Sequence, residues 1–159
     1  DFYRIVDLSY LESYVDSVIK EMYLTKNSIN HLSTIYLGGG TPSVLGPFLL
    51  NKLLSSISKY FKVSCVEEFT VECNPEDITE DLVDVLINNG VNRVSLGVQS
   101  LNDKMLKFLN RRHDSNKVYD SISLLHSKNI NRLIIMKILS NLVYLFLLLP
   151  VLSFLQLTV

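Results

Sequence analysis

Short apolar segments alternate with helical segments along this chain, and no other feature constrains its fold as strongly. Strands are expected at Thr34–Leu37, Glu68–Cys73, Asn92–Val98 and Ile130–Met136, since each is short, apolar and bounded by turn residues. Strands that alternate with helices form parallel sheets joined by right-handed crossovers. The sequence therefore predicts an α/β fold with a parallel sheet.

Five helices are expected around these strands, because apolar residues recur there at helical spacing. They cover Ser9–Leu24, Phe48–Tyr60, Thr79–Asn89, Asn102–Leu109 and Ser115–Lys128. Their first residues are expected to act as side-chain caps: Ser9 (with Glu12 closing a capping box), Thr79, Asn102 and Ser115. Gly90 is expected at the C′ position of the third helix.

Composition excludes several functional classes. The chain has 159 residues, 48% of them apolar and 19% charged, which excludes intrinsic disorder and allows one domain with a real core. The net charge of −1 gives no electrostatic reason to bind nucleic acid. Cys65 and Cys73 cannot form a disulfide framework or a four-thiolate metal site, and the histidines lack partners at ligand spacing, so no metal site is expected.

The C-terminal residues differ from the rest of the chain. Residues 134–159 carry a single charge, Lys137, and are apolar over Leu142–Leu155. This run of about 14 residues is shorter than the ~20 needed to span a bilayer, so a buried or re-entrant element is expected. We therefore expect residues 1–133 to form the domain and residues 134–159 to be an apolar tail.

Polar and glycine-rich residues follow the first three expected strands. Gly38-Gly39-Gly40-Thr41-Pro42 follows the first, Glu72 lies at the end of the second, and Gln99 follows the third. Because ligands bind at the carboxyl ends of parallel strands, these residues are expected to face one pocket. The glycines would let the backbone approach a ligand closely, and the pattern is neither a Walker loop nor a GxGxxG turn.

Each of these residues also has a purely structural interpretation. The glycines could form a flexible turn, Glu72 could pair with a nearby arginine, and Gln99 could belong to a capped loop. Arg111 and Arg112 follow the fourth expected helix, where one of them could hold a ligand carboxylate or both could form a solvated surface pair. The residue pattern alone leaves these alternatives open.

Three segments, taken together, resemble a known family. GGGTPS after a strand, FTVECNPEDIT, and GVNRVSLGVQSLNDKMLKFLNRRHD are similar to radical S-adenosylmethionine (SAM) proteins of the oxygen-independent coproporphyrinogen III oxidase type. The closer resemblance is to their heme-chaperone, HemW-like branch, and it covers about residues 1–132. It implies a partial (β/α) barrel in which SAM binds a [4Fe–4S] cluster held by three cysteines.

The resemblance also implies site residues. Gly39, Gly40 and Thr41 would receive the methionine amino group of SAM and the adjacent part of the molecule. Glu72 and Gln99 would contact SAM at the second and third strand ends, and Arg111 would reach its carboxylate or ribose. No catalytic residue is implied.

Two departures from the family pattern suggest a fragment. The three cluster cysteines are absent, and by the match they would lie just before Asp1. The family continues after Asn-Ile-Asn with an Asp-Leu-Ile-Tyr-Gly-Leu-Pro-like strand end, whereas Asn131 is followed here by Arg132 and the apolar tail. A shift of reading frame is one hypothesis for that tail. We expect this stretch to be inactive alone. The sequence leaves open whether the protein is an enzyme.

The function expected from the resemblance is SAM and cluster binding in porphyrin or heme metabolism, in the cytoplasm. Heme or a porphyrin is the expected partner, with no nucleic acid and no membrane for the core domain. The oxidase branch has a further cysteine just after the cluster triad, and Phe2 stands at that position here, which favours the heme-chaperone branch. The alternatives are another radical SAM enzyme and a non-catalytic α/β fragment with a membrane-associating tail.

Overall fold

A computed structural model describes residues 8–28, 31–137 and 155–158 of the chain. The apolar run from residue 142 lies mostly outside these residues, as do Phe2 and the start of the chain. Among the described residues, no helix is both long enough and apolar enough to cross a membrane.

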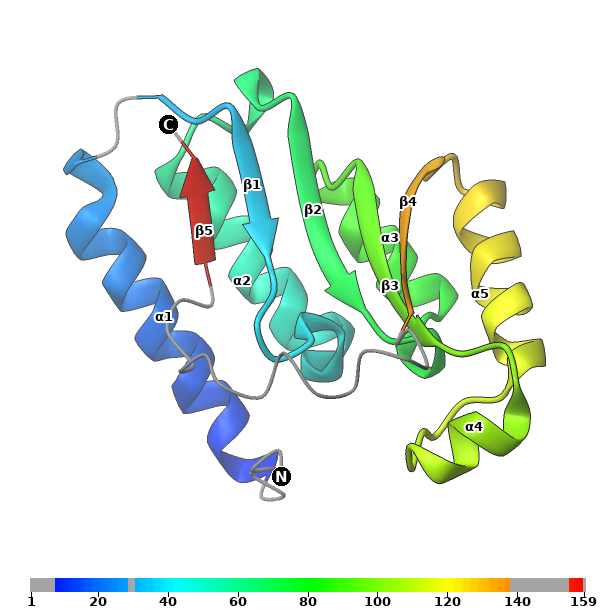
Figure 1. The fold of residues 1–159 in the computed structure, drawn as a ribbon. Helices are drawn as coiled ribbons and strands as arrows, with labels where there is room; N and C mark the ends of the chain where they lie inside the picture. The colour runs from blue at the N-terminus through cyan, green and yellow to red at the C-terminus, as the bar shows by residue number, and fades with distance from the viewer. Residues whose placement is uncertain (1–7, 29–30, 138–154, 159) are drawn as a thin grey trace.

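The core of the fold is one sheet with the strand order β4-β3-β2-β1-β5. Its parallel strands are β1 (Thr34–Leu37), β2 (Glu68–Cys73), β3 (Arg93–Gln99) and β4 (Arg132–Lys137). The predicted parallel α/β fold is therefore confirmed. A further strand, β5 (Leu155–Thr158), pairs antiparallel with β1 (Figure 1).

The helices are α1 (Leu11–Thr25), α2 (Gly46–Tyr60), α3 (Glu80–Asn88), α4 (Asp103–Phe108) and α5 (Ser115–Ser127). Each parallel strand lies beside the next one in the sequence. Since such crossovers all turn the same way, the helices collect on one side of the sheet, where Figure 1 shows α2 and α3 behind β1 to β3. This is the arrangement of a partial (β/α) barrel.

The two faces of the sheet differ in polarity because side chains alternate along each strand. One face is apolar and buried, and it forms the core with the helices: Ile35, Leu37, Phe69, Val71, Cys73, Val94, Leu96 and Val98. The other face carries polar side chains: Tyr36, Glu68, Thr70, Glu72, Arg93 and Ser95. A one-residue slip of any strand would bury these charges among the helices, so this polarity fixes the register.

Two of the four expected helix caps are confirmed. The Oγ1 of Thr79 accepts a hydrogen bond from the N–H of Leu82 at 3.3 Å. The Oδ1 of Asn102 accepts from the first turn of α4. Gly90 follows α3 with φ +81°, as expected of a C′ glycine.

The other two expected caps are wrong. The N-cap of α1 is Tyr10, not Ser9, because a 3-10 turn over Leu8–Tyr10 runs directly into the helix. The N-cap of α5 is Asp114, whose Oδ1 accepts from the N–H of Lys117 at 2.8 Å. Ser115 is the first residue of that helix and lies beyond the extended position that a cap needs.

β4 continues past residue 133, the expected end of the domain, as far as Lys137. Ile134, Ile135 and Met136 of this strand remain partly exposed. The boundary between domain and tail stays a prediction.

Candidate functional site

The Glu72 carboxylate, at the carboxyl end of β2, joins two neighbouring segments. Its Oε1 accepts a hydrogen bond from the hydroxyl of Tyr36 on β1, at 2.6 Å. Its Oε2 accepts from the backbone N–H of Gly39, at 3.1 Å. The side chain therefore binds the glycine loop directly instead of pairing with an arginine, and Glu68 is the β2 carboxylate that pairs with Arg93.

Gly38 lets this contact form because a side chain would not fit there. A Cβ at Gly38 would lie 2.5 Å from Cε1 of Tyr36 and 2.6 Å from Cδ of Glu72, far inside van der Waals contact. The loop then turns through left-handed conformations at Gly39 (φ +96°) and Thr41 (φ +56°). The glycine loop is thus shaped around the Glu72 carboxylate, and Gly39 and Gly40 are exposed.

The hydrogen bonds leave Glu72 able to take a further donor. A carboxylate offers about four acceptor sites, and Tyr36 and Gly39 use two. Burial, followed by the hydrogen bond to Glu72, raises the pKa of Tyr36, so the phenol stays a donor at neutral pH. This end of the sheet can therefore hold a cationic group such as an ammonium.

Gln99 lies at the end of β3 in a tight turn. Its φ is +64°, and the N–H of Ser100 donates to the Val98 carbonyl at 2.7 Å, which is the hydrogen-bond pattern of a γ-turn. A Cβ at Gly97 would lie 3.2 Å from the Gln99 Nε2 and 3.4 Å from the Asn74 Oδ1. The Gln99 amide therefore folds back over β3 toward the residue that follows β2.

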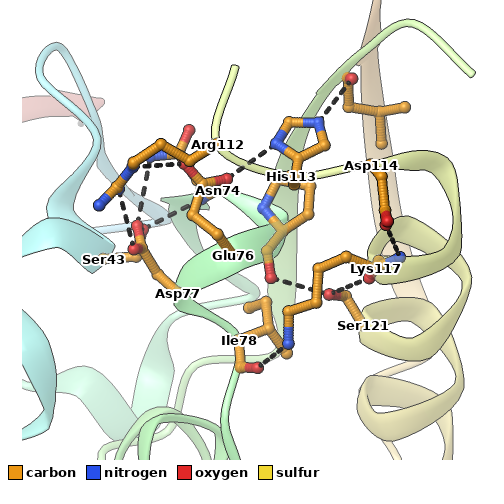
Figure 2. A network of polar contacts seen from close by, with 12 residues as sticks. Ser43, Asn74, Glu76, Asp77, Ile78, Arg112, His113, Asp114, Lys117 and Ser121 are labelled. Atoms are coloured by element: carbon orange, nitrogen blue, oxygen red, sulfur yellow. Dashed lines mark hydrogen bonds and ion pairs between the residues drawn. The ribbon is translucent and has the colours of Figure 1, made fainter. Parts of the chain in front are cut away.

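A serine and an aspartate connect the first two loops. The Oγ of Ser43, just after the glycine loop, donates to Oδ2 of Asp77 at 2.6 Å and accepts from the N–H of Asn74 at 3.0 Å. The Asn74 amide also donates to the Asp77 carboxylate, at 3.2 Å. The loops after β1 and β2 are thus fixed relative to each other (Figure 2).

Glu76 connects the second loop to the segment before α5. Its Oε1 accepts from Arg112 at 3.1 Å, and its Oε2 lies 2.8 Å from Nδ1 of His113. Arg112 also contacts Asp77, at 3.4 Å, while its side chain remains 56% exposed, so it is a surface residue that pairs with two carboxylates. The sequence interpretation missed these roles, although the acidic pair after Pro75 and the Arg-Arg-His run were visible signals.

Arg111 lies just after α4, on a different segment from the expected site residues at the strand ends. Arg111 lines an open hollow of about 430 Å³ together with Glu76, Asp103, Lys107 and Lys117. Within the described part of the chain, no hydrogen bond or ion pair joins it to Glu72 or Gln99. Of the expected residues, Glu72, Gly39, Gly40, Thr41 and Gln99 thus lie at neighbouring strand ends, and Arg111 lies on the α4 side.

The donor set of this chain does not fit a metal cluster. Over residues 8–28, 31–137 and 155–158, no group of three or more His, Cys, Asp or Glu side chains could hold a metal ion. Cys65 is exposed before β2, while Cys73 is buried at its other end. Burial strongly raises the pKa of the Cys73 thiol, which disfavours the thiolate that a cluster requires.

Comparison with known proteins defines the class. The radical SAM superfamily matches residues 9–146 of the chain. The chain therefore belongs to the radical SAM superfamily, and the resemblance seen in the sequence is confirmed. Membership implies SAM and a [4Fe–4S] cluster as the cofactors of such proteins.

Individual relatives show which radical SAM proteins the chain is similar to. The chain is 44% identical over 112 residues to the heme chaperone HemW of Lactococcus lactis, which covers 70% of this chain and 29% of that protein. It is 37% identical over 114 residues to HemW of Bacillus subtilis, covering 70% and 30%. It is 32% identical over 89 residues to the oxygen-independent coproporphyrinogen III oxidase of Escherichia coli, covering 56% and 20%.

Solved structures agree with the fold. Coproporphyrinogen III oxidase (HemN) from E. coli, a radical SAM enzyme, superimposes with a TM-score of 0.72 at 24% identity, over 80% of this chain and 30% of that one. The methyltransferase TsrM from Kitasatospora setae, solved with cobalamin and a [4Fe–4S] cluster, gives 0.54 at 15% identity, over 77% and 24%. The chain spans 29–30% of the length of the first two curated relatives.

Proposed function

We propose that the carboxyl ends of β1, β2 and β3 form a SAM-binding site. The observation that carries this proposal is the contact of the Glu72 carboxylate with the Gly39 N–H, because it sets a carboxylate with free acceptor sites against an exposed glycine backbone. Glu72 and the backbone of Gly39, Gly40 and Thr41 would receive the methionine amino group. A methylated sulfonium and an ammonium suit such an anionic, sterically open position.

Gln99 and Arg111 would complete the site from its other side. The Gln99 amide can both donate and accept hydrogen bonds, which suits the polar atoms of SAM. The Arg111 guanidinium would approach the SAM carboxylate from the hollow beside α4, since planar guanidinium groups bind carboxylates bidentately. These roles agree in sign with the charges of the ligand: an anionic side chain for its ammonium and a cationic one for its carboxylate.

The cluster belongs to other parts of the whole protein in this proposal. Neither cysteine of this stretch is placed to hold it, so residues 1–133 would supply the N-terminal part of the SAM-binding core and not the cluster ligands. In the whole protein a [4Fe–4S] cluster supplies the electron that radical SAM proteins use. The residues described above bind and orient SAM.

For the whole protein we propose heme binding and transfer in the cytoplasm, with heme as the partner. The higher identity to HemW proteins than to the coproporphyrinogen oxidase supports this choice. Oxidation of coproporphyrinogen III is the second candidate, favoured by the similarity to HemN in fold. Full-length protein that binds heme, seen as a Soret band, without turning over coproporphyrinogen would support the chaperone function; turnover would contradict it.

Calorimetric titration of the 159-residue chain with SAM tests the site. We expect binding that Glu72→Gln weakens about tenfold or more, as expected for the loss of a charge-assisted hydrogen bond. Glu67→Gln is the matched control, since Glu67 is exposed before the opposite end of β2. Equal affinities of the two variants would contradict the proposed role of Glu72, and absence of SAM binding to the native chain would contradict the site.

The coding DNA tests the origin of the apolar tail. We propose that residues 134–159 arise from a shifted reading frame, because the family pattern after Asn131 is replaced by apolar sequence. Translation of the other frames should yield an Asp-Leu-Ile-Tyr-Gly-Leu-Pro-like strand end. If neither frame contains one, the tail is native to the protein, and partitioning into detergent with and without it then tests membrane association.

A further inference from the structure

His113 is a buried histidine with both ring nitrogens engaged. It lies between α4 and α5, and its side chain is 0% exposed. The Nε2 atom lies 3.1 Å from the Val98 carbonyl oxygen, and the Nδ1 atom lies 2.8 Å from Oε2 of Glu76 (Figure 2). A carbonyl oxygen only accepts hydrogen bonds, so Nε2 carries a proton.

The second ring nitrogen faces a carboxylate. Burial acts to raise the pKa of Glu76, but its backbone N–H, the hydrogen bond from His113 and the charge of Arg112 together lower it. An ionised carboxylate only accepts, so Nδ1 must donate as well. With Glu76 ionised, both contacts are satisfied only by a ring that carries a proton on each nitrogen.

The charges around this pair favour the same state. Arg112 contacts the other oxygen of Glu76 and also Asp77. From α5, Lys117 donates to the Ile78 carbonyl, and Asp114 accepts from the Lys117 backbone. The Arg112 guanidinium thus faces one carboxylate oxygen of Glu76, and Nδ1 of His113 faces the other.

The Val98 carbonyl that His113 binds is the one that closes the turn at Gln99. It accepts from the Ser100 N–H at 2.7 Å and from His113 at 3.1 Å. The central residue of this turn has φ +64°, a left-handed conformation that is unfavourable for a non-glycine residue. A donor fixed from outside the turn can hold it in that conformation.

We propose that His113, held as an imidazolium by Glu76, is a positioning residue that fixes the Val98 carbonyl and thereby the direction of the Gln99 side chain. The inference rests on the proposed function in one respect only, which is that SAM is the ligand of Gln99. His113 touches no ligand in this role. Through Glu76, Arg112, Asp77 and Ser43, the same network extends to the glycine loop.

Nitrogen-15 spectra of the histidine rings in the full 159-residue chain test the charge state at pH 7. We expect protons on both ring nitrogens of His113 in the native chain. Glu76→Gln should leave only Nε2 protonated, because the amide of Gln can donate to a neutral ring. A single ring proton in the native chain would overturn the proposal.

The turn and the ligand site provide the second test. His113→Leu should abolish the strong amide-to-Hα Overhauser effect that a positive φ gives Gln99, and weaken SAM binding about tenfold. His113→Gln keeps a donor for the carbonyl and should restore part of both signals. The control is His126→Leu, since His126 is exposed near the end of α5 and contacts Asn131.

The outcomes separate this inference from the proposed function. If His113→Leu retains the Gln99 signal, the inference is wrong whatever SAM does. If the native chain binds no SAM, the proposed site is wrong, while the ring protons and the Gln99 turn still decide the role of His113. Should His113→Leu fail to fold, the native and Glu76→Gln spectra decide it.

Discussion

The hydroxyl of Tyr36 donates to Oε1 of Glu72 at 2.6 Å across the β1–β2 pair, while Oε2 of the same carboxylate accepts from Gly39. Tyr36 and Glu72 lie on the polar face of the sheet, and Gly38 packs against both. The carboxylate therefore has one orientation, set from two sides.

Removing the phenol hydroxyl should loosen that orientation. Tyr36→Phe keeps the ring that packs against Gly38 and deletes only the donor, so we expect a folded chain whose affinity for SAM falls several-fold. Calorimetry measures the affinity, and circular dichroism confirms the fold. Tyr119→Phe, at an exposed tyrosine of α5, should change neither quantity; an unchanged affinity of Tyr36→Phe would show that Gly39 alone orients Glu72.

A methyl group at Gly38 should destabilise the chain. Gly38→Ala would place Cβ 2.5 Å from Tyr36 and 2.6 Å from Glu72, and such overpacking costs about 1–3 kcal/mol. Urea denaturation measures the loss. Gly97→Ala is the milder comparison, because its Cβ would lie 3.2 Å from Nε2 of Gln99 and 3.4 Å from Oδ1 of Asn74. Equal losses of unfolding free energy at the two positions would argue against a steric cause.

The N-cap of α5 can be tested by a pair of neighbouring substitutions. Asp114→Ala removes the acceptor of the Lys117 N–H and should cost about 1 kcal/mol of unfolding free energy. Ser115→Ala should cost much less, since Ser115 already lies inside the helix. Thermal or urea unfolding compares them, and the reverse order would restore Ser115 as the cap.

Glu76 should make stability depend on pH in the acid range. Its pKa is lower in the folded chain than in the unfolded chain, so the unfolded state binds more protons wherever the two differ. The stabilisation is complete above the unfolded pKa of about 4.3 and is lost as pH falls through the lowered folded value. Urea midpoints between neutral pH and pH 3 measure it; Glu76→Gln should flatten the curve, Glu67→Gln should not, and parallel curves would contradict the assignment.

The strand positions could be predicted because apolar runs and turn residues agree with tertiary structure at β1, β2 and β3. Thr79, Asn102 and Gly90 were predictable for the same reason, as each occupies a position that local chemistry dictates. Asp114 was missed because it and Ser115 are adjacent and both can cap, and only backbone conformation distinguishes them. β5 could not be predicted, because its pairing with β1 joins segments far apart in the sequence.

The site was predictable only in part. Topology places Glu72, Gln99 and the glycine loop at one edge, since all three follow parallel strands. The roles of Ser43, Glu76 and His113 depend on contacts between residues 15 to 37 positions apart, which no local pattern reveals. Arg111 was expected from the resemblance; it lines a hollow together with Glu76 and Lys117, and its role in binding SAM stays a prediction.

The polar network from Ser43 to Ser121 draws all its members from one uninterrupted stretch of the polypeptide. Over the described residues, the side chains that make these contacts all lie at or before α5. Downstream βα units could therefore be exchanged, lengthened or lost in evolution without changing the side-chain contacts of this network. The same three loops could then serve both enzymes and carrier proteins that differ in the downstream parts of their chains.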